Sequence, residues 1–94
     1  MILQIPPNTY VDVTTEALLA ETDGVSIEYF DGAPLGASVY FALLSAAPTS
    51  DADAQAKLIC DDNNFKCVRT VQGVAGKKIY AWHRQNNSIS VAVG

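Results

Sequence analysis

The feature that most constrains the fold of this chain is a series of short segments in which apolar and polar or small residues alternate. The clearest of them is the run 88–93, where serine or alanine alternates with isoleucine or valine. A period of two places alternate side chains on opposite faces of a β-strand. The chain shows no long helical period, so the sequence predicts an all-β protein.

Turn-forming residues separate these segments at close intervals. The run 37–45 is apolar on both faces, which favours a strand that is buried on both sides or faces a partner. Seven or eight short strands predict an antiparallel β-sandwich or jelly-roll-like domain. The strands are expected at 9–15, 25–30, 37–45, 57–60, 65–71, 77–84 and 88–93.

Three other segments need separate interpretation. Good helix formers at 16–20 offer a short helix at 15–21 as an alternative to the end of the first strand. The small, polar residues 49–56 are interpreted as a loop, with one helical turn capped by Ser50 or Asp51 as the alternative. Residues 1–8 are interpreted as an arm that precedes a single sandwich domain at 9–94.

Composition and charge narrow the functional classes. The 94 residues carry a net charge of −4 with six scattered basic residues, which disfavours binding to nucleic acid. The longest strongly apolar run, 39–44, is far shorter than the roughly 20 residues of a membrane helix, and no secretory signal is recognised. Because 49% of the residues are hydrophobic and only 17% are charged, we expect some apolar surface to face another subunit.

The two cysteines form the first candidate site. If Asn63 and Asn64 are the central residues of a tight hairpin, Cys60 lies directly opposite Cys67. Opposed residues lie about 4.5 to 5.5 Å apart at Cα, which suits a disulfide. Two buried thiols in a reducing cytosol are an equal alternative. A zinc site would need more ligands than one histidine and two cysteines supply.

No catalytic or metal-binding pattern stands out in the rest of the chain. The four aspartates between residues 51 and 62 do not match the spacing of a calcium-binding loop and are interpreted as solvated carboxylates. His83 has neither a nucleophile motif nor a paired acid near it in sequence, and is interpreted as an ordinary strand residue. We therefore expect neither a cofactor nor an enzymatic activity.

The aromatic residues form the second candidate site. On a strand at 77–84, Tyr80 and Trp82 share one face, and the residues between and after them share the other. An outward-facing pair would anchor a protein interface or stack on a sugar ring, whereas a buried Trp82 would be the core aromatic of the sandwich. The residues proposed for an interface or a ligand platform are Tyr29, Tyr40, Tyr80 and Trp82.

A series of short elements runs from residue 9 to residue 93. They are Thr9 to Val13, a turn near Gly24 followed by Val25 to Ile27, Pro48 after a central strand, Gly73 to Gly76 before Tyr80-Ala81-Trp82, and Ile89 to Val91. The series resembles small β-sandwich accessory proteins found on the heads and tails of tailed-bacteriophage virions. The resemblance implies a non-enzymatic capsid decoration or tail accessory protein that assembles with itself, often as a homotrimer, and attaches to the capsid or tail.

Further expectations follow from this resemblance. The apolar arm 2–5, stiffened by Pro6 and Pro7, would dock on a neighbouring subunit. The protein would be located in the virion after synthesis in the host cytoplasm. The alternative function is a carbohydrate- or receptor-binding module that contacts a host surface glycan, with its aromatic candidates as the stacking platform. Neither hypothesis involves a nucleic acid or a membrane.

Overall fold

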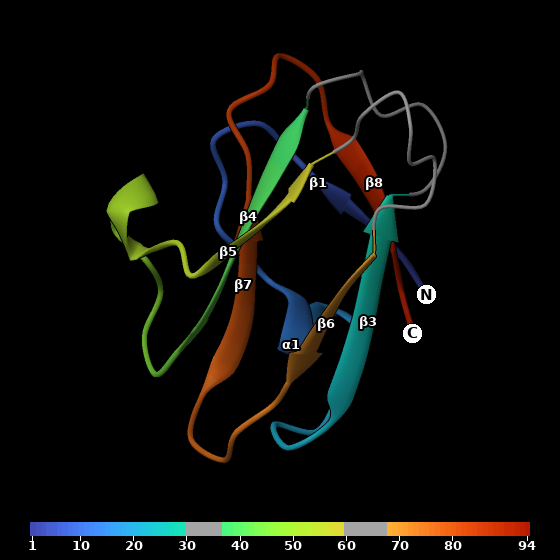
Figure 1. Ribbon diagram of the computed structural model, residues 1–94, viewed down its shortest axis with the longest axis vertical. Helices are drawn as coiled ribbons and strands as arrows, with labels where there is room; N and C mark the ends of the chain where they lie inside the picture. The colour runs from blue at the N-terminus through green and yellow to red at the C-terminus, as the bar shows by residue number, and fades with distance from the viewer. Residues whose placement is uncertain (30–36, 60–67) are drawn as a thin grey trace.

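Two antiparallel four-stranded β-sheets form the body of the protein in a computed structural model that describes residues 1–29, 37–59 and 68–94 (Figure 1). One sheet has the strand order β1-β8-β3-β6 and the other has the order β2-β7-β4-β5. This confirms the predicted all-β sandwich. The strands are β1 (Ile2–Ile5), β2 (Val11–Asp12), β3 (Gly24–Tyr29), β4 (Ser38–Leu44), β5 (Ala56–Ile59), β6 (Val68–Gln72), β7 (Lys78–Trp82) and β8 (Ile89–Val93).

The pairing of the strands is that of a jelly roll. β1 pairs with β8, β2 with β7, β3 with β6 and β4 with β5, all antiparallel. These pairs are successive parts of one long hairpin, and they alternate between the two sheets, so the hairpin is wrapped around the sandwich. The additional pairs β3–β8 and β4–β7 complete each sheet.

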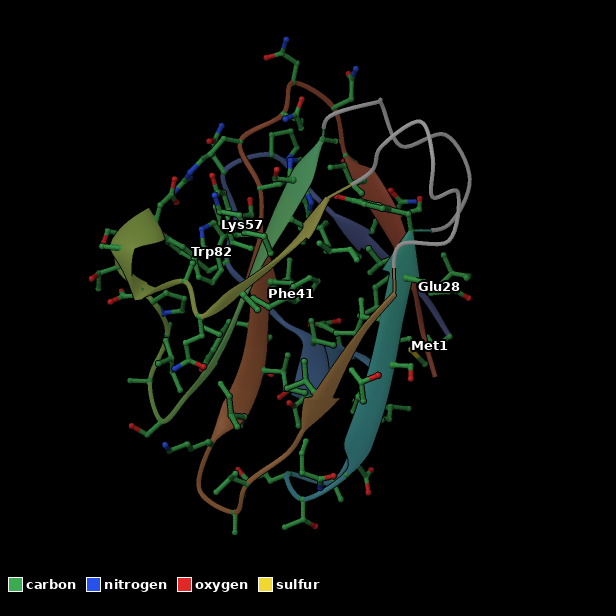
Figure 2. The ribbon with its side chains drawn as sticks, viewed as in Figure 1. Met1, Glu28, Phe41, Lys57 and Trp82 are labelled. Atoms are coloured by element: carbon green, nitrogen blue, oxygen red, sulfur yellow. The ribbon has the colours of Figure 1, made fainter. Side chains whose placement is uncertain are left out.

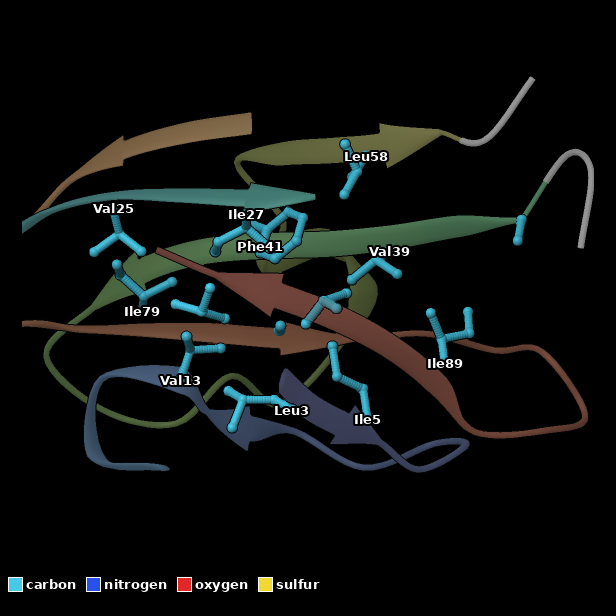
Figure 3. Close-up of a cluster of buried hydrophobic side chains, with 14 residues drawn as sticks. Leu3, Ile5, Val13, Val25, Ile27, Val39, Phe41, Leu58, Ile79 and Ile89 are labelled. Carbon is cyan, nitrogen blue, oxygen red and sulfur yellow. The ribbon is translucent and has the colours of Figure 1, made fainter. Parts of the chain in front are cut away.

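The hydrophobic core lies between the two sheets (Figure 3). Period-two alternation builds it: Ile89, Val91 and Val93 of β8 are buried, while the residues between them are half-exposed. Removing these side chains from water is the main stabilising contribution to such a fold. The buried members are Leu3, Ile5, Val13, Val25, Ile27, Ala37, Val39, Phe41, Leu58, Ile79, Ala81, Ile89, Val91 and Val93.

The first strand corrects the interpretation of residues 1–8 as an arm outside the sandwich. Residues 2–5 pair one by one with β8, from Ile2 opposite Ala92 to Ile5 opposite Ile89. Leu3 and Ile5 are buried in the core. The burial of these two side chains favours an edge strand of the chain's own sheet over a free arm. Four residues before two prolines are too short a run for the alternation to reveal a strand.

The strand predicted at 9–15 is only partly correct. Its first part contains β2, but helix α1 occupies Val13–Glu16. The helix begins there because the Asp12 carboxylate accepts a hydrogen bond from the Thr15 backbone N–H, at 3.0 Å, and so caps the first turn. The helical alternative at 15–21 was also misplaced, because α1 begins two residues earlier and ends at Glu16.

The segment 49–56 contains one turn of 3₁₀-helix, η1 (Asp51–Asp53), and corrects the loop interpretation. Ser50 is the N-cap, so the capped-turn alternative is the correct one. The Asp53 carboxylate accepts hydrogen bonds from the backbone N–H groups of Thr49 and Ser50, at 2.8 and 3.3 Å. The Thr49 contact, the stronger cause, holds the pKa of Asp53 below its usual value.

The hairpin expected between 57 and 71 is wrong for the residues that the structure describes. β5 and β6 lie in different sheets: β5 pairs with β4, and β6 pairs with β3. Their described parts therefore form no ladder with each other. Cys60, Cys67 and the expected turn at Asn63 and Asn64 lie outside the described residues, so the disulfide stays a prediction.

Candidate functional site

Three of the four aromatic candidates meet on the outer face of the sheet β2-β7-β4-β5. Tyr80 and Trp82 of β7 point away from the inter-sheet core, while Ile79 and Ala81 point into it, as the alternation predicts. Tyr40 of β4 lies opposite Trp82 in the register. We call this group the aromatic cluster. It comprises Ala42, Tyr80 and Trp82, with Tyr10, Tyr40, Leu44 and Ala54 packed against them.

Trp82, at the centre of the aromatic cluster, is 0% exposed. The Tyr10 ring meets it edge-on with 5.1 Å between centroids, and the Tyr40 ring stacks on it at 5.8 Å. The indole Nε1–H donates a hydrogen bond to Oδ1 of Asp51 in η1 at 2.8 Å. Figure 2 shows Trp82 close to η1. Trp82 therefore has no free face on which a sugar could stack, and it belongs to the core of this outer cluster rather than to the inter-sheet core.

An ion pair fastens η1 to the aromatic cluster. Arg84 Nη2 donates to Asp51 Oδ1 at 2.7 Å and to the Tyr10 hydroxyl at 3.1 Å. Hydrogen bonds from Arg84, and then from the Trp82 indole, hold the pKa of Asp51 below its usual value, while Asp51 raises the pKa of Arg84. Both groups stay charged near neutral pH, which suits a structural ion pair rather than a group that transfers protons.

Tyr10 and Tyr40 are the partly exposed rings of the aromatic cluster. Each ring has a cation beside it: Arg84 lies 5.6 Å from the Tyr10 centroid, and Lys57 Nζ lies 5.4 Å from the Tyr40 centroid. A ligand approaching this face would contact these two rings and their cations before it could reach Trp82.

Tyr29, the fourth aromatic candidate, lies away from the aromatic cluster and joins the two sheets. It belongs to β3, and its hydroxyl lies 2.9 Å from the Ala37 carbonyl oxygen and 2.6 Å from the Leu58 carbonyl oxygen. Leu58 is in β5 of the opposite sheet. The structure thus places Tyr29 in an inter-sheet contact, which its position in sequence did not indicate.

His83 is a buried polar link between β1 and the β7–β8 connection. Its side chain is 0% exposed, its Nε2 lies 2.6 Å from the Ile5 carbonyl oxygen, and its Nδ1 accepts from the Gln85 backbone N–H at 3.1 Å. Because a carbonyl oxygen only accepts and a backbone N–H only donates, the proton of the neutral ring is on Nε2. Both ring nitrogens are thereby occupied within the fold.

One end of the sandwich exposes two large apolar side chains that the sequence did not single out. Leu18, in the β2–β3 connection, is 84% exposed, and Val74, in the β6–β7 connection, is 46% exposed. The two connections lie at the same end of the molecule (Figure 1) and are joined by a 2.8 Å hydrogen bond from Gly73 N–H to the Asp23 carbonyl oxygen. We call this surface the apolar loop end.

Leu18 combines exposure with an unfavourable backbone conformation. It follows α1 in a Schellman motif, in which Leu18 N–H donates to Thr15 O at 3.1 Å and Leu19 N–H donates to Thr14 O at 2.9 Å. Its φ is +57°, in the left-handed region where glycine is usual. Such a conformation costs a leucine roughly 1–2 kcal/mol. Strain at an exposed apolar residue is a reason to look for function there.

The side of the sandwich between edge strands β1 and β2 contains an open hollow of about 560 Å³. It is lined by residues 2–4, Pro6, residues 9–12 and Glu16. Ile2 remains 45% exposed at its rim. In the described part of the chain, neither β1 nor β2 pairs with another strand on this side.

The described residues 1–29, 37–59 and 68–94 also bear on metal binding and membrane insertion. Among these residues no three His, Cys, Asp or Glu side chains gather closely enough to hold a metal ion, and no helix is long and apolar enough to cross a membrane. Comparison with protein-family models, curated protein sequences and solved structures found no match. Function must therefore be inferred from the aromatic cluster, the apolar loop end and the hollow beside β1.

Proposed function

We propose that the protein is a non-enzymatic structural component of a bacteriophage virion, a capsid decoration or tail accessory protein that associates with itself and attaches to the particle. The observation that carries the assembly part is Leu18, which is 84% exposed while its backbone has φ +57°. The virion part is supported by the resemblance of the short elements along residues 9–93.

Free-energy magnitudes favour contact at Leu18. The left-handed conformation costs a leucine roughly 1–2 kcal/mol, and glycine or asparagine would avoid most of it. Complete burial of a leucine side chain contributes about 1.5–3 kcal/mol. In an isolated subunit the conformational cost at Leu18 is not offset. When a neighbour covers Leu18, the burial of its side chain offsets that cost. Val74, in the β6–β7 connection, is a second exposed apolar side chain, with an exposed fraction of 46%.

The aromatic cluster is a separate, rigid surface that a partner could contact. Trp82, Asp51 and Arg84 are joined by hydrogen bonds of 2.8 and 2.7 Å, which fix η1 against β7. A preordered surface loses less conformational entropy when it binds.

A second candidate function, binding of a host surface glycan, is favoured by the partly exposed rings of Tyr10 and Tyr40. Glycan-array binding that is lost in Tyr40→Ala with the fold intact would support it. Because Trp82 is 0% exposed, it is excluded as the direct platform in this arrangement.

Light scattering over a series of concentrations tests the assembly part. We expect the wild-type chain to self-associate at micromolar concentration and Leu18→Asn, which tolerates the same φ, to weaken association by roughly tenfold or more. Ser88→Asn, an exposed change in the β7–β8 connection, is the matched control and should leave association unchanged. A wild-type chain that stays monomeric and also fails to bind virions would contradict the proposal.

A further inference from the structure

We propose that β1 is an exchangeable strand: β1 of one copy replaces its counterpart on β8 of a second copy, and the reciprocal exchange forms a dimer. The inference rests on the proposed self-association and specifies how it is achieved. Its basis is the way β1 is held, the hollow on its other flank, and the residue at which the chain reverses after it.

β1 is held by its ladder with β8 and by the contact of His83 Nε2 with the Ile5 carbonyl oxygen, at 2.6 Å. In the described part of the chain it pairs with β8 alone. Met1 and Val93 exchange two backbone hydrogen bonds, at 2.9 and 2.7 Å, so the antiparallel alternation also directs the N–H and C=O groups of Leu3 toward β8. The β1 of a second copy would form the same ladder on β8.

The flank of β1 that faces β2 is open. The hollow of about 560 Å³ lies there, and Ile2 and Gln4 are exposed. Leu3 and Ile5 are the side chains of β1 that enter the core. Exchange between two copies preserves the burial of both side chains, because each β1 enters an identical site.

The chain reverses direction immediately after β1, at Asn8. The residue before a proline is restricted to extended conformations, so Ile5 and Pro6 favour a straight continuation into Pro6 and Pro7. The reversal is made by Asn8 at φ +56°, and its N–H donates to the His83 carbonyl oxygen at 3.0 Å. Extension of Asn8 alone would carry β1 away from its own β8. A short hinge that bends at one left-handed residue favours strand exchange.

A second copy is the occupant because the structure shows the complementary surface in full. The ladder of residues 2–5 on β8 and the core sites of Leu3 and Ile5 are already the fit between β1 and its groove. The closed monomer, in which β1 pairs with β8 of the same chain, and the exchanged dimer then differ mainly in the conformation of the hinge at Asn8. Their ratio is therefore set by the hinge conformation and by protein concentration.

An engineered cross-link distinguishes exchange from other association. Gln4 and Ser90 lie opposite each other in the ladder, with Gln4 Nε2 donating to Ser90 Oγ at 2.6 Å. They form a non-hydrogen-bonded pair, whose Cα atoms lie about 4.5 Å apart, a separation that a disulfide tolerates. The test variant combines Gln4→Cys and Ser90→Cys with Cys60→Ser and Cys67→Ser.

The reduced variant is first incubated at high concentration and is then oxidised. It is run on a denaturing gel without reductant. In the exchanged dimer each disulfide joins two chains, so we expect a covalent dimer; in the closed monomer the disulfide lies within one chain. Gln4→Cys alone, in the same background, controls for random cross-linking and should give no comparable dimer. A dimer by light scattering that runs as a monomer on the gel would overturn strand exchange and leave self-association standing.

Hinge variants give an independent readout. Asn8→Val disfavours the left-handed conformation and should raise the ratio of dimer to monomer by roughly tenfold. Asn8→Gly accepts that conformation freely and should lower the ratio. A ratio that neither change moves, or a chain that stays monomeric as wild type and as Asn8→Val, would overturn the exchange. The proposed function would fail only if the chain also failed to bind virions.

Discussion

The inter-sheet core and the aromatic cluster are both buried and apolar, but they are held together differently. Among the described residues, the fully buried members of the inter-sheet core are aliphatic side chains and Phe41, brought together by the alternation of the strands. The aromatic cluster lies on the outer face of a sheet, where side chains are usually exposed to solvent. Two hydrogen bonds hold η1 over it: Trp82 donates to Asp51 at 2.8 Å, and Arg84 donates to Asp51 at 2.7 Å. The inter-sheet core depends mainly on apolar packing, whereas the aromatic cluster also depends on an ion pair.

The largest expected effect is a loss of core packing. Phe41→Ala should lower the free energy of unfolding by about 3–5 kcal/mol, because it leaves a cavity in a site that is 2% exposed. Urea denaturation followed by circular dichroism measures this loss. Tyr40→Ala, the adjacent residue on the opposite face of β4, removes a similar ring from the aromatic cluster and should cost less than half as much. Equal losses would show that the two clusters do not differ in this way.

A change at Trp82 should have an intermediate effect. Trp82→Phe keeps an aromatic ring but removes the Nε1–H donor and part of the buried volume, which should cost about 2 kcal/mol in unfolding free energy. Tyr80→Phe, on the same face of β7, removes only a hydroxyl and should change stability by about 0.5 kcal/mol or less. If Trp82→Phe were as stable as the wild type, the indole contact with Asp51 would not hold the cluster.

The smallest expected effect is a pH dependence confined to the aromatic cluster. The pKa of Asp51 is lowered from 3.8 in the fold, first by Arg84 and then by Trp82, so the charged carboxylate stabilises the native cluster. That contribution is complete above pH 3.8 and is lost as the pH falls through the lower native pKa. Near-ultraviolet circular dichroism should therefore change in acid before the far-ultraviolet signal of the sheets does.

Asp51→Asn separates the causes of this transition. It should reduce the acid-induced change in the near-ultraviolet signal. A remainder should persist from Asp53, whose pKa is also lowered, first by its hydrogen bond from Thr49. An unchanged transition in Asp51→Asn would contradict the role of the ion pair.

The two clusters differ in how far local sequence patterns predict them. The inter-sheet core follows from local alternation, as in 88–93, and so does the shared face of Tyr80 and Trp82. Local alternation does not predict that Trp82 is covered. Asp51 and Arg84 meet across 33 positions in sequence, and no local pattern encodes that contact. Turn signals near 61–64 likewise could not distinguish a hairpin from a crossing between sheets, and β5 and β6 belong to different sheets.

The apolar loop end could not be found from the sequence for a different reason. The left-handed position after a helix is usually signalled by glycine, and this chain places Leu18 there. Short apolar stretches at 2–5 and around Leu18 read alike in sequence, yet β1 enters the core whereas Leu18 remains exposed. Burial of the β1 side chains stabilises the sandwich itself, and we propose that Leu18 is buried only when a second subunit covers it.

The most decisive measurement is co-sedimentation of the purified chain with phage particles that lack it. We expect the wild-type chain and Ser88→Asn to sediment with the particles at a fixed ratio of chain to particle, and Leu18→Asn to sediment at a clearly lower ratio because its subunits associate less. If the wild-type chain failed to sediment with particles that lack it, and mass spectrometry also found none of it in purified virions, the protein would not be a virion component.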